Sequence, residues 1–189
     1  MALAIMTILG AIVLPSVSSY LDREQVTESA ATLDSLRVSI GRFRTATTDY
    51  PGRLSHLSKL IKITPLPADL TGCNTAANSP QTAYVAASVT GWLNNGPFWD
   101  RSIPRTGFVL PIGTVRDSMT RTSVSTVAGT LVMTIPGVTI EDARELNLVE
   151  DGPLDVDQVD GSNTTGTVRF TLPASSSTVT YHIPVGVGC

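Results

Sequence analysis

The chain begins Met-Ala-Leu-Ala-Ile-Met-Thr-Ile-Leu-Gly-Ala-Ile-Val-Leu over residues 1–14, and Pro15 follows this run. No charged residue occurs before Asp22, so a helix over this segment is apolar on every side. A helix of this length measures about 21 Å, whereas the hydrocarbon core of a bilayer is about 30 Å thick. The run by itself is therefore too short to span a membrane.

Three interpretations of this apolar segment are open. A secretory signal peptide starts with a positive charge, but the first basic residue here is Arg23. A helix in the core of a globular protein is the simplest interpretation. The third is a membrane or filament-core helix whose first residues precede Met1. In the last two cases the segment needs apolar surroundings, which are the protein's own core, lipid or other helices.

A helical pattern continues beyond Pro15, because no proline occurs again before Pro51. Apolar residues recur at steps of three and four, the period of one helix face, at Val26, Ala30, Leu33, Leu36, Ile40 and Phe43. A proline inside a helix kinks it when neighbouring groups satisfy the freed carbonyl. We therefore expect one long helix, apolar over residues 1–21 and amphipathic over residues 22–50.

The remainder predicts a β-rich domain. Prolines and glycines make residues 51–82 a loop, with one short helix near Leu54 and Leu57. Alternating apolar residues in 83–189 predict strands over residues 83–89, 127–135, 168–172 and 179–183, the last two forming a hairpin. Between them, Thr139 and Asp142 have the spacing of a cap for a helix that ends near Val149. The expected fold is α+β, with the long N-terminal helix packed through Leu33, Leu36, Ile40 and Phe43 on a mainly antiparallel sheet.

Composition excludes several functions. The net charge is −3 and the isoelectric point about 5.3, so no specific nucleic-acid site is evident. The two cysteines and two histidines do not form a zinc-ligand motif, because Cys73 and Cys189 lie far apart in the sequence, as do His56 and His182. The sequence contains no nucleophile elbow, phosphate-binding loop or dinucleotide fingerprint, so we expect a protein that is not an enzyme.

The order of these features resembles the type IV pilin superfamily. The matching stretches are Ile8 to Pro15, Asp22 to Arg37 and Asp49-Tyr50-Pro51. The spacing from Gln25 to Pro51 is most similar to that of the type IVb pilins, and residues 135–152 add a weaker match. The resemblance covers residues 1–51 well and the rest only in layout.

The resemblance implies a structural subunit that polymerises with identical subunits into an extracellular filament on a bacterial cell. It implies storage in the inner membrane before assembly, and assembly machinery as a partner. The residues expected to pack in the filament core are Leu9, Gly10, Ile12, Leu14 and Pro15. Two alternatives are a pseudopilin of a type II secretion system and a membrane-anchored extracytoplasmic binding module.

One family feature is missing from the sequence as it stands. Mature type IV pilins carry a glutamate at their fifth position, and aligning Pro15 with the family's proline leaves about seven residues upstream of Met1. Adding seven residues lengthens the apolar stretch to about 31 Å, which spans a bilayer. We therefore expect that the natural chain begins before Met1.

The resemblance also bears on the cysteines, because pilins close a C-terminal loop with one disulfide. In an exported chain an even pair favours a disulfide as well, so Cys73 and Cys189 are expected to be bonded; two unpaired buried cysteines are the alternative. Calcium is a weaker possibility, because acidic residues cluster near one loop, at Glu150, Asp151, Asp155, Asp157 and Asp160. Solvated carboxylates are the favoured interpretation, and no other cofactor is expected.

Two further features have a functional and a structural interpretation. Trp92, Phe98 and Trp99 lie near a stretch rich in glycine, asparagine and proline, and we expect them to anchor the core rather than to contact a partner. Asn163-Thr-Thr165 fits the acceptor pattern for N-glycosylation, although the pattern alone is a weak signal.

Overall fold

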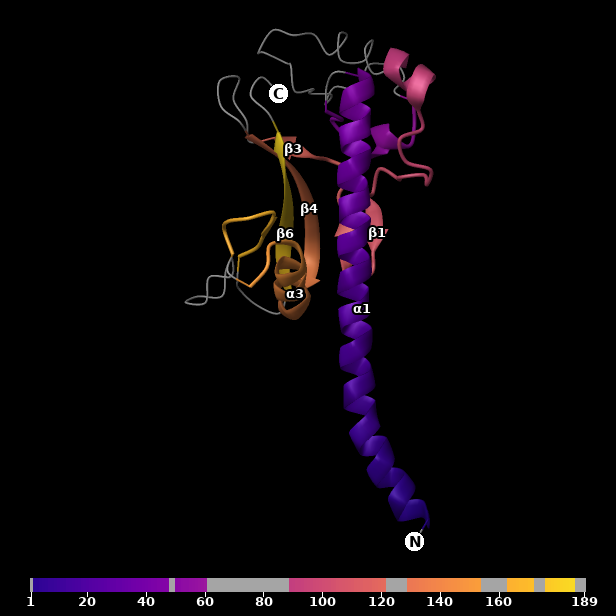
Figure 1. Ribbon diagram of the computed structural model, residues 1–189, viewed down its shortest axis with the longest axis vertical. Helices are drawn as coiled ribbons and strands as arrows, with labels where there is room; N and C mark the ends of the chain where they lie inside the picture. The colour runs from indigo at the N-terminus through magenta and orange to yellow at the C-terminus, as the bar shows by residue number, and fades with distance from the viewer. Residues whose placement is uncertain are drawn as a thin grey trace.

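The computed structural model describes residues 2–47, 50–60, 89–121, 129–153, 163–171 and 176–185, and for residues 2–22, 121 and 176 it describes the backbone alone. Helix α1 spans Ala2–Thr47, a length of about 69 Å. Pro15 lies inside this helix without ending it, as the sequence predicted. The described chain is α+β with antiparallel sheets, and Figure 1 shows the first turns of α1 continuing past the sheet.

The larger sheet has four strands in the order β3-β4-β6-β5. Their bounds are β3 Thr120–Arg121, β4 Gly129–Thr139, β5 Val168–Arg169 and β6 Ser176–Val185. Each neighbouring pair is antiparallel, and β4 and β6 are paired from Gly129 opposite Val185 onwards. The register shifts between Ile135 and Val138, where Gly137 has a φ of +75° that a side chain rarely adopts. The predicted hairpin near the C-terminal end is confirmed by the pairing of β5 with β6.

A second sheet and a helix complete the body. Strands β1 (Phe108–Leu110) and β2 (Gly113–Val115) form an antiparallel hairpin. The residue after β2, Arg116, donates its amide to the Thr134 carbonyl at 2.8 Å, which joins this hairpin to β4. Helix α3 (Ile140–Glu150) follows β4, and the Thr139 side chain accepts a hydrogen bond from the Asp142 amide at 3.1 Å. The predicted helix cap is therefore confirmed.

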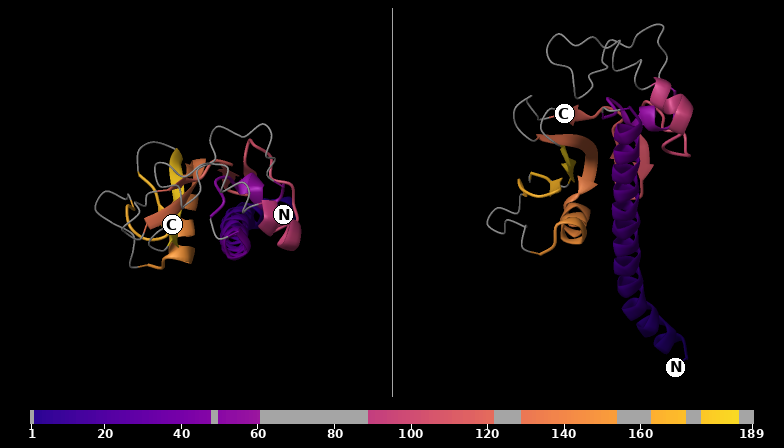
Figure 2. Two further views of the ribbon diagram at one scale, coloured as in Figure 1. Left: turned by 90° about the horizontal axis from the view of Figure 1, so that it is seen from above. Right: turned by 45° about the horizontal axis from the view of Figure 1, so that its top comes forward.

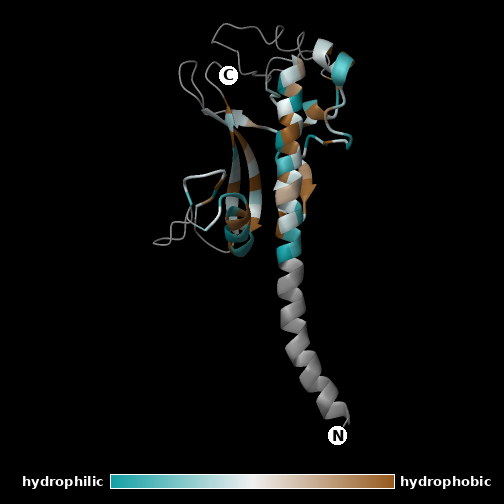
Figure 3. Ribbon diagram, viewed as in Figure 1, coloured by the Kyte–Doolittle hydropathy of each residue, from teal (hydrophilic) through white to brown (hydrophobic). Residues whose placement is uncertain are grey.

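The predicted apolar stripe of α1 is buried in one core with the two sheets. Leu33, Leu36, Ile40 and Phe43 are each 0% exposed, and Figure 3 shows apolar residues on α1 near those of the strands. The packed part of α1 is thus its second half, residues 23–47. Burying side chains of this size stabilises a fold by about 1.5–3 kcal/mol each, so this stripe fixes α1 to the body.

The aromatic cluster also belongs to the core, as expected. Phe98 is 3% exposed, and its ring contacts that of Phe43 edge-on at 5.3 Å between centroids. The Trp92 ring lies against Phe98 at 6.4 Å, and its indole nitrogen donates to the His56 carbonyl at 2.9 Å. Trp99 is partly buried and packs on the same core. These side chains hold the segment around residues 89–100 against the end of α1.

Several sequence predictions for the remaining segments need correction or stay open. Val89 was predicted to end a strand, but residues 89–95 are helical. A Cβ at Gly91 would lie 2.5 Å from the Ala46 carbonyl oxygen, so this helix approaches α1 more closely than a side chain allows. The short helix near Leu54 is confirmed as the 3-10 helix η1, Leu54–Leu57. The rest of the predicted strand at 83–89 lies outside the described residues, and the sequence did not predict β1, β2 or β3.

Candidate assembly surface

The second half of α1 has two sides of different chemistry. Its inner side is the buried apolar stripe, and its outer side is exposed and mainly charged or polar. Three hydroxyls of the outer side donate to carbonyls one turn back in the same helix: Thr27 to Arg23, Ser35 to Ala31 and Thr45 to Gly41, at 2.8–3.0 Å. Because these three donors are already bonded within the helix, covering them with another molecule leaves their own hydroxyl hydrogens satisfied.

A groove runs along this outer side where α1 meets residues 95–100. One part, of about 820 Å³, is lined by residues that include Val38, Arg42, Tyr50 and Phe98. A second part, of about 470 Å³, shares Val38, Arg42 and Phe98 and reaches Asp100. Since three lining residues are common to both parts, the two parts are neighbours, and we call them together the α1 groove. Val38 is 57% exposed in it.

The α1 groove carries charges of both signs. Asp34 and Asp100 line one part, Arg44 lines the other, and Arg42 lines both. The Arg44 guanidinium lies 4.8 Å from the centre of the Tyr50 ring, a cation–π contact that keeps the positive charge in that part of the groove. One part of the groove is therefore lined by both acidic and basic residues, and the other part by arginines alone among the charged residues.

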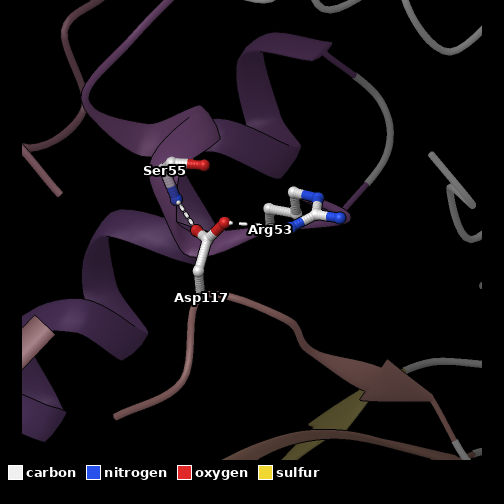
Figure 4. Close-up of polar contacts among 3 residues, drawn as sticks. All are labelled: Arg53, Ser55 and Asp117. Atoms are coloured by element: carbon white, nitrogen blue, oxygen red, sulfur yellow. Dashed lines mark hydrogen bonds and ion pairs between the residues drawn. The ribbon is translucent and has the colours of Figure 1, made fainter. Parts of the chain in front are cut away.

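The segment that carries Tyr50 is fixed to the body by a buried ion pair. The Asp117 carboxylate accepts a hydrogen bond from the Arg53 guanidinium at 3.2 Å and one from the Ser55 amide at 2.7 Å (Figure 4). The Asp117 carbonyl also accepts from the Leu54 amide at 2.9 Å. The Asp117 side chain is 1% exposed and that of Arg53 is 17% exposed. This anchor fixes the segment after Tyr50 to the body, and it was not predicted from the sequence.

His56 lies next to this anchor and does not have the properties of a general base at neutral pH. It is 7% exposed, and burial lowers its pKa to about 4, with Arg53 and Arg105 acting in the same direction and Asp117 opposing. Burial also lowers the pKa of His182, whose ring nitrogen lies 3.2 Å from the Thr130 hydroxyl. Both cysteines lie outside the described residues, so the expected bond between Cys73 and Cys189 stays a prediction.

A second exposed surface lies on α3, and we call it the α3 ridge. Its apolar members are Leu148 and Val149, which are 45% and 49% exposed. The exposed Glu141 and Arg144 and the half-buried Glu145 lie on the same side of this helix. Within its own chain, Glu145 makes a contact with Arg23 at 3.9 Å, which is too long to be strong.

The two described members of the predicted calcium set have other partners. The Asp151 carboxylate accepts hydrogen bonds from the amides of Thr167 and Val168 at 2.8 and 2.7 Å and from the Asn147 side chain at 3.2 Å. These bonds fix the start of β5 to the end of α3. Asp155, Asp157 and Asp160 lie outside the described residues. Within the described ranges, no three histidine, cysteine or acidic residues are grouped so as to hold a metal ion.

Glu150, the other member, accepts a hydrogen bond from the Tyr181 hydroxyl at 3.0 Å. Burial raises the pKa of Glu150, the Asp34 and Asp151 carboxylates act in the same direction, and the Tyr181 hydroxyl and Arg37 oppose them. Burial, with the Glu150 charge, also raises the pKa of Tyr181. This hydrogen bond links β6 to α3 and occupies one carboxylate oxygen of Glu150.

Asn163, which fits the glycosylation pattern, has a structural role in the fold. Asn163 is 1% exposed, and its side-chain amide donates to the Val168 carbonyl at 2.7 Å. Its side-chain oxygen accepts from the Thr165 amide at 3.2 Å. The Asn163 side-chain nitrogen, the acceptor atom of the pattern, is therefore buried and hydrogen-bonded in the folded chain.

The residues predicted to pack in a filament core, Leu9, Gly10, Ile12, Leu14 and Pro15, lie within α1, and their side chains are outside the description. Where side chains are described, no helix is long and apolar enough to cross a bilayer. The sequence analysis missed the α1 groove and the α3 ridge. The signal that was available is Val38, an apolar residue on the polar side of the predicted helix.

Comparison with known proteins identifies no relative: no protein-family model matches the chain, and no curated protein or solved structure matches it significantly.

Proposed function

We propose that the chain is a structural subunit that polymerises through the apolar half of α1 into an extracellular filament of the type IV pilus kind. The globular body then covers the outside of a central bundle of helices. A subunit of this kind is held in the inner membrane before assembly and leaves it when identical helices replace lipid. Because a helix satisfies its own backbone hydrogen bonds, that exchange costs few of them.

The observation that carries the proposal is the continuity of α1. It runs for 46 residues through Pro15 and joins an apolar half to a half that is fixed to the body by a buried stripe. Figure 2 shows the first turns of α1 extending past the sheet and α3. An apolar helix that leaves its own body needs other apolar partners, and copies of itself supply them.

A test uses acidic substitutions in the apolar half. Leu9→Asp and Ile12→Asp place a charge where helices would pack, and they are expected to abolish filaments seen by electron microscopy of producing cells. Gln25→Asp is the matched control, because it adds the same charge at an exposed position of the same helix. Protection of β4 and β6 amides from hydrogen exchange would show that the body still folds in all three variants. Normal filaments from Leu9→Asp and Ile12→Asp would contradict the proposal.

The second candidate within the same class is a pseudopilin of a type II secretion system. The helix and body have the same roles in both, so the structure does not favour either. Long filaments on wild-type cells support the pilus subunit, whereas short periplasmic assemblies and a secretion defect on deletion support the pseudopilin. A membrane-anchored binding module predicts neither kind of assembly.

A further inference from the structure

The sequence contains one asparagine that is followed directly by glycine, Asn95 before Gly96. The structure places this pair where the helix over residues 89–95 ends, and the Asn95 side chain is exposed. An asparagine in this position is prone to deamidation, because the following glycine has no side chain to hinder attack of its backbone nitrogen. The pair is therefore a candidate site of chemical modification.

The fold itself requires a glycine at position 96. A Cβ added at Gly96 would lie 2.6 Å from Cδ2 of the Trp92 ring and 2.8 Å from the Trp92 carbonyl oxygen, so a side chain does not fit. The Trp92 ring cannot easily give way, because its indole nitrogen donates to the His56 carbonyl and its ring lies against Phe98. The labile pair is thus a consequence of how this segment packs.

Two hydrogen bonds restrain the reacting groups in the folded chain. The Gly96 amide must lose its proton before its nitrogen can attack, and it donates to the Trp92 carbonyl at 2.8 Å. The Asn95 side-chain nitrogen donates to the Gly91 carbonyl at 3.2 Å. Both bonds belong to the last turn of the helix, so the Gly96 nitrogen becomes available when that turn opens.

We propose that Asn95 is a site of spontaneous deamidation that is gated by opening of the last helical turn before Gly96. The Gly96 nitrogen loses its proton to solvent hydroxide and forms a bond to Cγ of Asn95, while the bond from Cγ to Nδ2 breaks and ammonia leaves. Water then opens the resulting succinimide ring at either carbonyl, which leaves aspartate or isoaspartate at position 95. One water is consumed for each ammonia released, and the inference does not depend on the proposed function.

The product changes the charge of the α1 groove. Asn95 lines the part of the groove whose charged lining residues are Arg42 and Arg44. The new carboxylate adds one negative charge there, which takes the formal net charge of the chain from −3 to −4. Isoaspartate also lengthens the backbone just before Gly96, where the contact with Trp92 leaves no room. Deamidation therefore converts an arginine-lined surface into one of mixed charge.

Timed incubation of the full chain in detergent at mildly alkaline pH tests the proposal. Peptide mapping by mass spectrometry is the readout, and the same chain unfolded in urea is the reference. Asn95 is expected to convert in both samples, at least about tenfold more slowly in the folded chain, because the reaction waits for local opening. Asn95→Gln should abolish the conversion, since glutamine closes the corresponding ring far more slowly. Asn94→Gln, the matched control, should leave the rate at Asn95 unchanged.

The gate is tested at Leu93, which is 70% exposed in the same helix. Leu93→Gly weakens the helix without removing a buried contact, and Leu93→Ala removes the same side chain but keeps a strong helix former. In the folded chain Leu93→Gly is expected to convert Asn95 severalfold faster than Leu93→Ala does, with equal rates in urea. Protection of β4 and β6 amides from hydrogen exchange shows that both variants stay folded.

Three results would overturn the proposal. One is an Asn95 that stays intact in urea, which would mean that the pair is not labile. Another is the same rate in the folded and unfolded chains, which would mean that the fold imposes no gate. The third is the same rate for the two folded Leu93 variants, including no conversion in either, which would mean that opening of the helix does not control the reaction.

Discussion

Arg53 and Asp117 form a buried ion pair, with Nη1 and Oδ2 3.2 Å apart, between the segment after α1 and the segment after β2. The same carboxylate accepts the Ser55 amide at 2.7 Å. Removing one partner of a buried pair leaves the other charge without compensation, which is more harmful than never having had the pair. This pair therefore fixes the segment after α1 to the segment after β2.

Asp117→Ala is expected to destabilise the body by about 3 kcal/mol, because it removes the buried carboxylate that accepts from the Ser55 amide and pairs with the Arg53 guanidinium. Asp117→Asn keeps an acceptor oxygen for the amide and should lose less. The measurement is urea denaturation of the full chain in detergent, followed by tryptophan fluorescence. Ser118→Ala, at the exposed neighbouring position, is the control. A loss below about 0.5 kcal/mol for Asp117→Ala, typical of a surface change, would show that the pair is not an anchor.

The lowered pKa of His56 leads us to expect that the stability of the fold depends on pH. Its folded pKa is about 4 and its ordinary value is 6.5, so between these values the unfolded chain binds a proton that the folded chain does not. The contribution of His56 to the free energy of unfolding should therefore be highest above pH 6.5. It should fall by about 3 kcal/mol as the pH is lowered to 4. His56→Gln should remove most of this contribution. Equal slopes of unfolding free energy against pH for the two chains would refute the assignment.

The Asp151 carboxylate, directly after α3, is expected to hold β5 in place. Asp151→Ala leaves the buried amide of Val168 without an acceptor, and the expected loss is about 2 kcal/mol. Hydrogen exchange at Val168 should accelerate more than exchange at β4. Glu141→Ala, an exposed acid on the same helix, should change neither quantity much. Unchanged exchange at Val168 would mean that the carboxylate is dispensable.

The sequence predicted the elements whose pattern is local and long. The stripe from Val26 to Phe43 was correct because a helix face repeats every three or four residues over many turns, and each repeat adds to the signal. The Thr139 cap was predicted because its motif lies within four consecutive residues. Strand β4 was predicted because its alternating apolar residues extend over a long strand.

The errors came from contacts between distant residues. Val89 ends an alternating run that predicts a strand, but residues 89–95 are helical. Gly91 in this helix packs closely against Ala46 at the end of α1, a contact that the local sequence does not reveal. Strand β1 has three residues, too few for a period to be read. Asp117 and Arg53 are 64 positions apart, so only the fold brings them together. The α1 groove was missed for the same reason, because its two walls come from α1 and from residues 95–100.

The central claim is that the apolar half of α1 is buried among copies of itself. Electron cryo-microscopy of filaments sheared from producing cells tests it most directly. The account predicts a helical filament in which residues 2–22 from neighbouring copies form the central bundle and the sheets lie outside. A monomeric particle in which residues 2–22 fold back onto their own sheet would contradict it.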